Sequence, residues 1–252
     1  MHMTDRGLIA LARHEGIVPA PYLDVKRVWT FGVGHTAGAG APDPARMPRG
    51  MPADLDAGVR KALRLFQDDL ARYETEVLRA VTVPLSTHEF DALVSFHYNT
   101  GAIARAALTR HLNAGDRTGA GASFMNWLRP ASLRPRREAE RDLFLRANYP
   151  NGPIPVWAAD ADGRVDFSRP VRRLGATEAL ALLRPAPATA PASQVESASR
   201  PGGWFGPRST AGQPISVKRI GLLCGAQAVV PTLSIPSGRS RWGFDHQLRM
   251  SL

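Results

Sequence analysis

The chain has 252 residues, of which 44% are hydrophobic and 7% aromatic, as in an ordinary soluble protein with one sizeable domain and an appendage, or with two small domains. Its net charge of +10 favours polyanionic partners such as nucleic acid, anionic lipid or the bacterial wall, but charge alone does not choose among them. Cys224 is the sole cysteine, which excludes an internal disulfide.

The beginning of the chain shows no targeting pattern. Residues 1–16 lack a basic stretch followed by a long apolar run, so we predict no secretory signal peptide. The late apolar run at 220–230 is interrupted by Gly and Gln and is far shorter than a membrane span. We therefore expect a product made in the cytoplasm, without stable membrane insertion.

The first predicted elements are a helix and a group of short strands. Thr4 is a good N-cap for a helix that runs to about residue 14. Gly16 suits the end of this helix, and the prolines that follow prevent its continuation. β-Branched and aromatic residues predict short strands within 22–36, and the Gly-, Pro- and Ala-rich segment 37–52 predicts an irregular loop.

A series of helices follows. Apolar residues at three- and four-residue steps, opposite a charged face, predict a long helix over 54–80. Ser86 and Glu89 form a capping box that opens another helix, which ends near Gly101. Shorter helices are predicted after it, over 103–113, 116–128 and 136–148.

Past residue 150 the pattern changes to strands and then to a segment that is unsuited to a core. Residues 155–159 and 164–168 are predicted to form a hairpin around the turn at 160–163, followed by a short helix at 175–183. The Pro- and Ala-rich composition beyond this helix predicts linker or disorder. The predicted organisation is a domain at 1–148, a hairpin and helix extension at 149–184 that packs on or beside it, and a low-order tail at 185–252.

The segment from Glu15 to His35 holds the residue types that cleavage of a glycosidic bond needs. Such cleavage uses one carboxylic acid held protonated beside the leaving oxygen and a second carboxylate kept ionised on the other face of the sugar. The apolar residues after Glu15 are expected to desolvate it, whereas Asp24 lies on a polar turn beside two basic residues and is expected to stay ionised. Thr30 offers a hydroxyl that can hold a water molecule. By spacing alone, two such acids are more often solvated turn residues.

The residues around these acids resemble a known signature. The segment reads Glu15-Gly16-x5-Tyr22-x-Asp24-x5-Thr30-x-Gly32-x-Gly34-His35. It is similar to the signature of the phage-type lysozymes, glycoside hydrolase family 24, also called muramidases or endolysins. The resemblance covers about residues 4–148 and continues, in the family's order, through Phe90–Phe96 with Asn99 and Gly101, Leu112–Asp116 and Arg136–Arg141.

This resemblance implies a fold, an activity and site residues. The fold is α+β and lysozyme-like, a mainly helical domain with a small β-hairpin lobe near its N-terminus. The activity is peptidoglycan hydrolysis at the β-1,4 bond between N-acetylmuramic acid and N-acetylglucosamine, which causes lysis of the bacterial cell wall. Carried over by position, Glu15 is the general acid, and Asp24 with Thr30 handles the attacking water. No metal or organic cofactor is implied.

The resemblance also implies a cellular setting. Peptidoglycan is the implied substrate, and we expect a monomer. Nucleic acid is not expected as a partner, because Glu138 and Glu140 interrupt the basic run at 134–141 and no groove-reading motif accompanies it. A protein made in the host cytoplasm without a signal peptide needs a separate membrane permeabiliser, such as a holin, to reach the wall in the periplasm.

Four side chains near the motif carry interpretations of their own. Arg27 stands where family members usually have Gly, so we expect it to reshape the turn and to help keep the second carboxylate ionised. His35 is interpreted as structural, bonded to an acid or a carbonyl, with a proton switch in the cleft as the alternative. Asn99 marks a helix terminus or part of the sugar-binding wall. Arg137 either reaches the cleft and pairs with the predicted acid, or is a solvated charge or an interhelical ion pair.

Two other functions stay open at the level of the sequence. A wall-binding or virion structural module with a catalytically inactive lysozyme fold would keep the core pattern without turnover, and the intact Glu15, Asp24 and Thr30 argue against it. A polyanion-binding protein is supported by charge alone.

Overall fold

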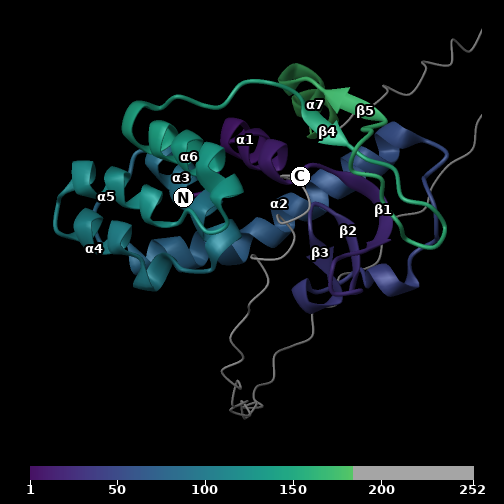
Figure 1. Ribbon diagram of the computed structural model, residues 1–252, viewed down its shortest axis with the longest axis horizontal. Helices are drawn as coiled ribbons and strands as arrows, with labels where there is room; N and C mark the ends of the chain where they lie inside the picture. Colours follow the sequence, from purple (N-terminus) through teal and green to yellow (C-terminus); the bar gives the residue numbers. More distant parts are fainter. Residues whose placement is uncertain (184–252) are drawn as a thin grey trace, which may run out of the picture. The chain divides into compact units, whose positions relative to one another are not determined.

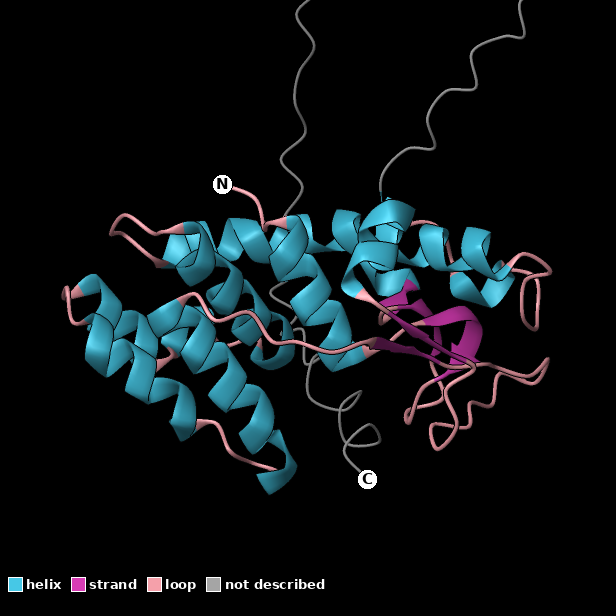
Figure 2. Cartoon of the chain, turned by 90° about the horizontal axis from the view of Figure 1, so that it is seen from above, coloured by secondary structure: helices cyan, strands magenta, loops and turns pink. Residues whose placement is uncertain are grey.

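The computed structural model describes residues 1–183. This part has the predicted α+β architecture, in which helices form most of the chain and the strands form two small antiparallel sheets (Figure 1). Figure 2 shows the strands gathered at one end of this part. The predicted tail at 185–252, with Cys224, lies outside the described residues.

The chain begins with helix α1 (Asp5–Glu15), as predicted. The side chain of Thr4 accepts the backbone N–H of Gly7 and caps the helix. Gly16 ends it with a φ of 69°, which glycine adopts without strain. A Cβ atom added at Gly16 would also collide with the ring of Trp157. The end of α1 is therefore fixed by both the backbone and its packing.

An antiparallel sheet follows α1. Its strands, in spatial order, are β1 (Val18–Leu23), β2 (Trp29–Gly32) and β3 (His35–Thr36). β1 begins earlier than predicted and contains two prolines, which an edge strand tolerates. The register of β1 against β2 is irregular over the proline segment and becomes regular at Tyr22, which lies opposite Thr30. The hairpin lobe is therefore regular where the motif residues lie.

Two long helices come next, and both are confirmed at their predicted ends. The side chain of Asp54 accepts a backbone N–H in the first turn of α2 (Leu55–Ala80) at 3.0 Å. α3 (Thr87–Thr100) opens with the predicted capping box, in which Ser86 and Glu89 each bond to the other's backbone N–H, and ends at a left-handed glycine.

The remaining helices differ from prediction at their ends. α4 (Ala107–Asn113) and α5 (Arg117–Ser123) each share the predicted segment with a 3₁₀ turn, at 103–105 and 124–126 respectively. α6 (Arg134–Arg146) begins earlier than predicted, with a proline in its first turn. Proline lacks a backbone N–H, but this costs no hydrogen bond here, because the first N–H groups of a helix have no partner within it. α6 packs against α3, so its charged side chains meet the core of the molecule.

The segment after α6 forms a different sheet from the predicted one. The predicted hairpin of 155–159 with 164–168 is confirmed only beside its turn, where Ala159 and Val165 form an isolated antiparallel bridge. The strand β4 (Ile154–Val156) pairs instead with β5 (Arg172–Leu174). The turn at 160–163 does form, and α7 (Ala176–Leu183) confirms the predicted last helix.

Side-chain packing explains why 164–168 is not a strand. Val165 and Phe167 pack against a small apolar cluster that contains Tyr22 and Trp157. The backbone N–H of Leu23 donates to the carbonyl of Gly163 at 2.8 Å. The residues after the turn therefore lie against β1 instead of pairing with β4.

This segment and the helices share one core. Ile154, Val156, Leu174 and Leu182 belong to the same buried cluster as the apolar residues of α1, α2 and α3. The backbone of Ile17 also joins this segment, because its N–H donates to the carbonyl of Pro155 at 3.0 Å and its carbonyl accepts the N–H of Trp157 at 2.9 Å. In residues 1–183, no helix has the length and hydropathy to cross a membrane.

Candidate active site

Glu15 is the last residue of α1, and only 2% of its surface is exposed. Nη1 of Arg136, on α6, donates to its Oε1 at 2.6 Å. Glu15 and Arg136 therefore form a buried ion pair between α1 and α6. The predicted desolvation of Glu15 is observed, but its immediate partner is a cation rather than its apolar neighbours in sequence.

Arg136 connects Glu15 to a second buried acid. Its Nε donates to Oε1 of Glu140 at 2.8 Å, and its Nη2 donates to the carbonyl of Ser95 at 3.2 Å. The Ser95 hydroxyl donates to the same oxygen of Glu140 at 2.7 Å. Burial alone would lower the pKa of Arg136, but Glu15 and Glu140 outweigh it and raise that pKa. Arg136 is therefore a permanent cation between two carboxylates.

Arg137 lies on a different side of α6, and the prediction that it pairs with Glu15 is wrong. Its guanidinium forms an ion pair with Glu140 within α6 and donates to the side-chain oxygen of Asn99 on α3. It is completely buried, so it is neither a solvated charge nor part of an ion pair between helices. Neighbouring residues of an α-helix point about 100° apart, so the two arginines reach different partners. Arg136 reaches α1 and the carbonyl of Ser95, whereas Arg137 reaches Asn99 one turn further along α3. Asn99 lies in the last turn of α3, at the helix terminus that was one of its two predicted places.

His14 precedes the predicted acid and remains neutral near pH 7. Burial and the guanidinium of Arg136 lower its pKa to about 3. A neutral imidazole at this place adds no further cation beside Arg136 and Arg137.

Asp24 and Thr30 meet at the peptide groups of Val28. The backbone N–H of Val28 donates to Oδ1 of Asp24 at 2.8 Å, and the Thr30 hydroxyl donates to the carbonyl of Val28 at 3.1 Å. The N–H of Lys26 donates to the same Asp24 oxygen at 2.9 Å. Two backbone donors thus orient the Asp24 carboxylate, and the structure brings both predicted water-handling residues to one turn.

Arg27 adopts a left-handed backbone conformation in this turn, with a φ of 61°. For a residue other than glycine this conformation costs on the order of 1 kcal/mol. β1 and β2 pair regularly up to Leu23 opposite Trp29. Arg27 therefore takes on the strained conformation itself, at the position where family members usually have Gly.

Tyr22 lies within electrostatic reach of both predicted catalytic acids. Its side chain is buried, and burial, then Asp24, then Glu15 raise the pKa of its phenol well above the usual range. The end of α1 and the turn between β1 and β2 therefore place Glu15 and Asp24 near one phenol.

His35, on β3, is buried and held on both sides. Its Nδ1 lies 2.9 Å from a carboxylate oxygen of Asp69 on α2, and its Nε2 lies 2.9 Å from the carbonyl of Pro42. Burial raises the pKa of Asp69, and the bond to His35 opposes that effect. An acid and a carbonyl are the partners that the structural interpretation of His35 predicts.

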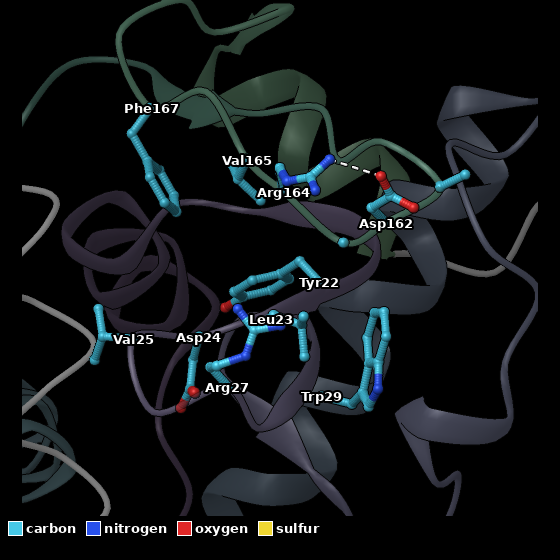
Figure 3. A pocket seen from close by; sticks show the side chains of 12 residues that line it. Tyr22, Leu23, Asp24, Val25, Arg27, Trp29, Asp162, Arg164, Val165 and Phe167 are labelled. Atoms are coloured by element: carbon cyan, nitrogen blue, oxygen red, sulfur yellow. Dashed lines mark hydrogen bonds and ion pairs between the residues drawn. The ribbon is translucent and has the colours of Figure 1, made fainter.

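A pocket of about 1120 Å³ opens beside Asp24 (Figure 3). One wall is the turn between β1 and β2, with Tyr22, Arg27 and Trp29, and the other is the loop at 161–167. Within residues 1–183, no group of three His, Cys, Asp or Glu side chains is placed to hold a metal ion. The site therefore combines a buried acid, Glu15 at the end of α1, with an oriented carboxylate and a hydroxyl, Asp24 and Thr30, on the hairpin of β1 and β2.

Sequence reasoning missed Arg136, Glu140 and Ser95. A signal for the first two was present, because Arg136, Glu140 and Phe144 follow one another at four-residue steps and share one face of α6. Phe144 is a large apolar residue that favours burial, so the charged residues on its face could have been expected in the core as well. Nothing in the sequence marks Ser95.

Comparison with known proteins decides the family. The profile of the phage lysozyme family matches residues 12–140, which include every residue of the site from Glu15 to Glu140. The chain belongs to this family. The endolysin of Salmonella phage P22 is 34% identical over 151 residues, covering 58% of this chain and 99% of the relative. The SAR-endolysin of Escherichia phage Mu is 35% identical over 149 residues, covering 56% of this chain and 78% of the relative.

Solved structures agree with the assignment to the phage lysozymes. A point mutant of P22 lysozyme has a TM-score of 0.51 and 32% identity, over 57% of this chain and 99% of that one. An endolysin from Escherichia coli O157:H7 phage FAHEc1 has a TM-score of 0.52 and 27% identity, over 60% of this chain and 98% of that one. The described chain therefore has the lysozyme-like fold, with β4, β5 and α7 lying beyond the profile of the family.

Proposed function

We propose that this protein is a peptidoglycan hydrolase of the muramidase type, which cleaves the β-1,4 bond between N-acetylmuramic acid and N-acetylglucosamine. The observation that carries the proposal is the buried Glu15 held by Arg136, together with an Asp24 carboxylate oriented at the same turn as Thr30. Membership of the phage lysozyme family supports glycosidase activity.

Each side chain has one step in the proposed reaction. Glu15 donates a proton to the glycosidic oxygen, while Arg136 holds its carboxyl group in place. Thr30 orients a water molecule, Asp24 accepts its proton, and the resulting hydroxide attacks the anomeric carbon. Inversion at that carbon requires the two carboxyl groups to stand about 6.5–9.5 Å apart, whereas about 5–5.5 Å would lead to retention.

The variant Glu15→Gln tests the acid. It keeps the size and the burial of the side chain but removes the proton that is donated, so the rate of turbidity loss in a wall suspension is expected to fall on the order of 10²- to 10⁴-fold. Glu138→Gln is the matched control, because the side chain of Glu138 on α6 is 43% exposed and its ion pair with Arg134 spans 3.6 Å. An undiminished rate in Glu15→Gln, with normal activity in the control, would show that another group is the acid.

Product analysis distinguishes the proposed hydrolase from the alternative, an inactive wall-binding module. The intact protein is expected to release new reducing ends from purified peptidoglycan, whereas an inactive module binds the wall without releasing any.

We also propose that the protein acts as a monomer and, being made in the cytoplasm, reaches the wall with a holin-type permeabiliser. Lysis by this protein expressed alone, with an undamaged membrane, would contradict the need for that partner.

A further inference from the structure

The pocket beside Asp24 is built in part by residues outside the family match. The turn between β1 and β2 lies within the matched residues 12–140, but the loop at 161–167 lies beyond them. Figure 3 shows Arg27 on the first wall and Arg164 on the second, with Val165 and Phe167 continuing the second wall. This chain therefore adds to the hairpin lobe a wall that the family signature does not include.

Arg27 combines two features that point to a use for its charge. Its backbone is strained, with a φ of 61°, and such conformations persist at sites where the strain serves function. Its side chain is exposed, and among the described residues its guanidinium has no ion-pair or hydrogen-bond partner. A strained residue thus holds an unpaired cation at the wall of a large pocket.

The other charges of the pocket are already engaged. Asp24 accepts two backbone N–H groups, and Arg164 forms ion pairs with Asp162 at 2.6 Å and Asp160 at 3.7 Å. Arg27 is therefore the cation of this lining that remains available to pair with an anionic ligand.

The shape and the apolar part of the pocket narrow the choice of ligand. At about 1120 Å³ the pocket exceeds the size of a small anion, and Phe167, Val165 and Trp29 give it apolar surface beside the charges. A short peptide with free carboxylates and small apolar side chains fits such a lining better than an uncharged sugar does. In peptidoglycan, a peptide of this kind hangs from each N-acetylmuramic acid, next to the bond that is cut.

We infer that this pocket binds the peptide stem of peptidoglycan, and that Arg27 forms an ion pair with a stem carboxylate. The inference rests on the proposed function, which supplies the substrate. Arg27 is then a residue that determines specificity, while the chemical step stays with the groups already described. The loop at 161–167 supplies the opposite wall, against which the apolar side chains of the stem pack.

The test compares two substrates that differ only in the charge of the stem. One is purified peptidoglycan with free stem carboxylates, and the other is the same material after its carboxylates have been coupled to ammonia as primary amides. The wild-type protein is expected to prefer the first. Arg27→Gln keeps a side chain at the strained position but removes the charge, so it is expected to reduce that preference by about two- to fivefold, as for one exposed ion pair, through the apparent KM and not through kcat.

Two further variants distinguish an effect of Arg27 in the pocket from an effect of the net charge of the protein. Arg27→Lys keeps the cation and is expected to keep most of the preference. Arg169→Ala changes the net charge by the same amount as Arg27→Gln, is exposed, and lies just past the pocket, so it is expected to keep the wild-type preference. Equal losses on both substrates in Arg27→Gln, or equal losses in Arg27→Gln and Arg169→Ala, would overturn the inference. A wild-type protein that cleaves neither substrate would instead refute the proposed function.

Discussion

Arg136 is the residue on which the buried polar network depends. It is 4% exposed and bonds to Glu15 at 2.6 Å and to Glu140 at 2.8 Å, so its removal leaves two buried acids without their shared cation. Glu140 would still be bonded to Arg137 and Ser95, but a buried acid that loses a cation at this distance is strongly destabilised. This arginine therefore contributes to stability as well as to the position of the proposed acid.

Arg136→Ala is expected to lower the free energy of unfolding by about 3–5 kcal/mol, because it breaks a buried ion pair. Arg134→Ala, on the same helix, is the control, since its exposed pair with Glu138 at 3.6 Å is worth about 0–1 kcal/mol. Urea denaturation followed by tryptophan fluorescence measures both. Similar losses in the two variants would contradict the central place of Arg136 in the network.

At the scale of the element, α3 carries a hydrogen-bond acceptor for each of the two arginines of α6. The carbonyl of Ser95 accepts from Arg136, and the side-chain oxygen of Asn99 accepts from Arg137. The capping box at Ser86 fixes the start of this helix, because the Ser86 N–H donates to Glu89 at 2.8 Å and its hydroxyl accepts the N–H of Glu89 at 3.4 Å. By fixing the start of α3, the capping box therefore helps to place Ser95 and Asn99 for their bonds to the arginines of α6.

Ser86→Ala is expected to lower the free energy of unfolding by about 1 kcal/mol through loss of this cap. Thr75→Ala, at an exposed position inside α2, is the control, and it is expected to be neutral or slightly stabilising because alanine is the best helix former. Thermal unfolding of both variants checks the prediction. A neutral Ser86→Ala would mean that the packing of α3 alone fixes its beginning.

The separation along the chain between two interacting residues explains which features the sequence predicts and which it does not. The caps at Thr4 and Ser86 act between residues close in sequence, and the helices that they open lie where the sequence places them. The strand expected at 164–168 fails because its apolar residues pack against Tyr22, a partner far away in the chain. The choice between the two arginines at the start of α6 depends on how that helix is rotated against α3, which no local pattern records.

At the scale of the whole described chain, burial gives several ionisable groups unusual proton affinities. It lowers the pKa of His14 to about 3, with help from Arg136, and it lowers the pKa of His97. These histidines bind protons less readily in the folded protein than in the unfolded one, so acid destabilises the fold through them. Burial raises the pKa of Asp69 and Asp91, which has the opposite effect in acid.

The free energy of unfolding is expected to fall more steeply on acidification in the wild type than in His14→Gln. The folded-state pKa of His14, about 3, lies below the ordinary value of 6.5, so the stability that its neutral form contributes is complete above pH 6.5 and is lost as the pH falls toward 3. Between pH 7 and pH 5 this difference amounts to about 2 kcal/mol. Groups common to both proteins cancel in the comparison.

Urea denaturation at pH 7, 6 and 5 measures this slope for the wild type, for His14→Gln and for His2→Gln. His2 is exposed at the N-terminus, and an exposed ion pair such as its contact with Glu74 is worth about 0–1 kcal/mol, so His2→Gln is expected to stay closer to the wild type than His14→Gln does. Parallel curves for the wild type and His14→Gln would mean that His14 takes up its proton in the folded state near its ordinary pKa. The cluster around Arg136 would then have to accommodate a further cation, which the close contacts of that guanidinium with Glu15 and Glu140 argue against.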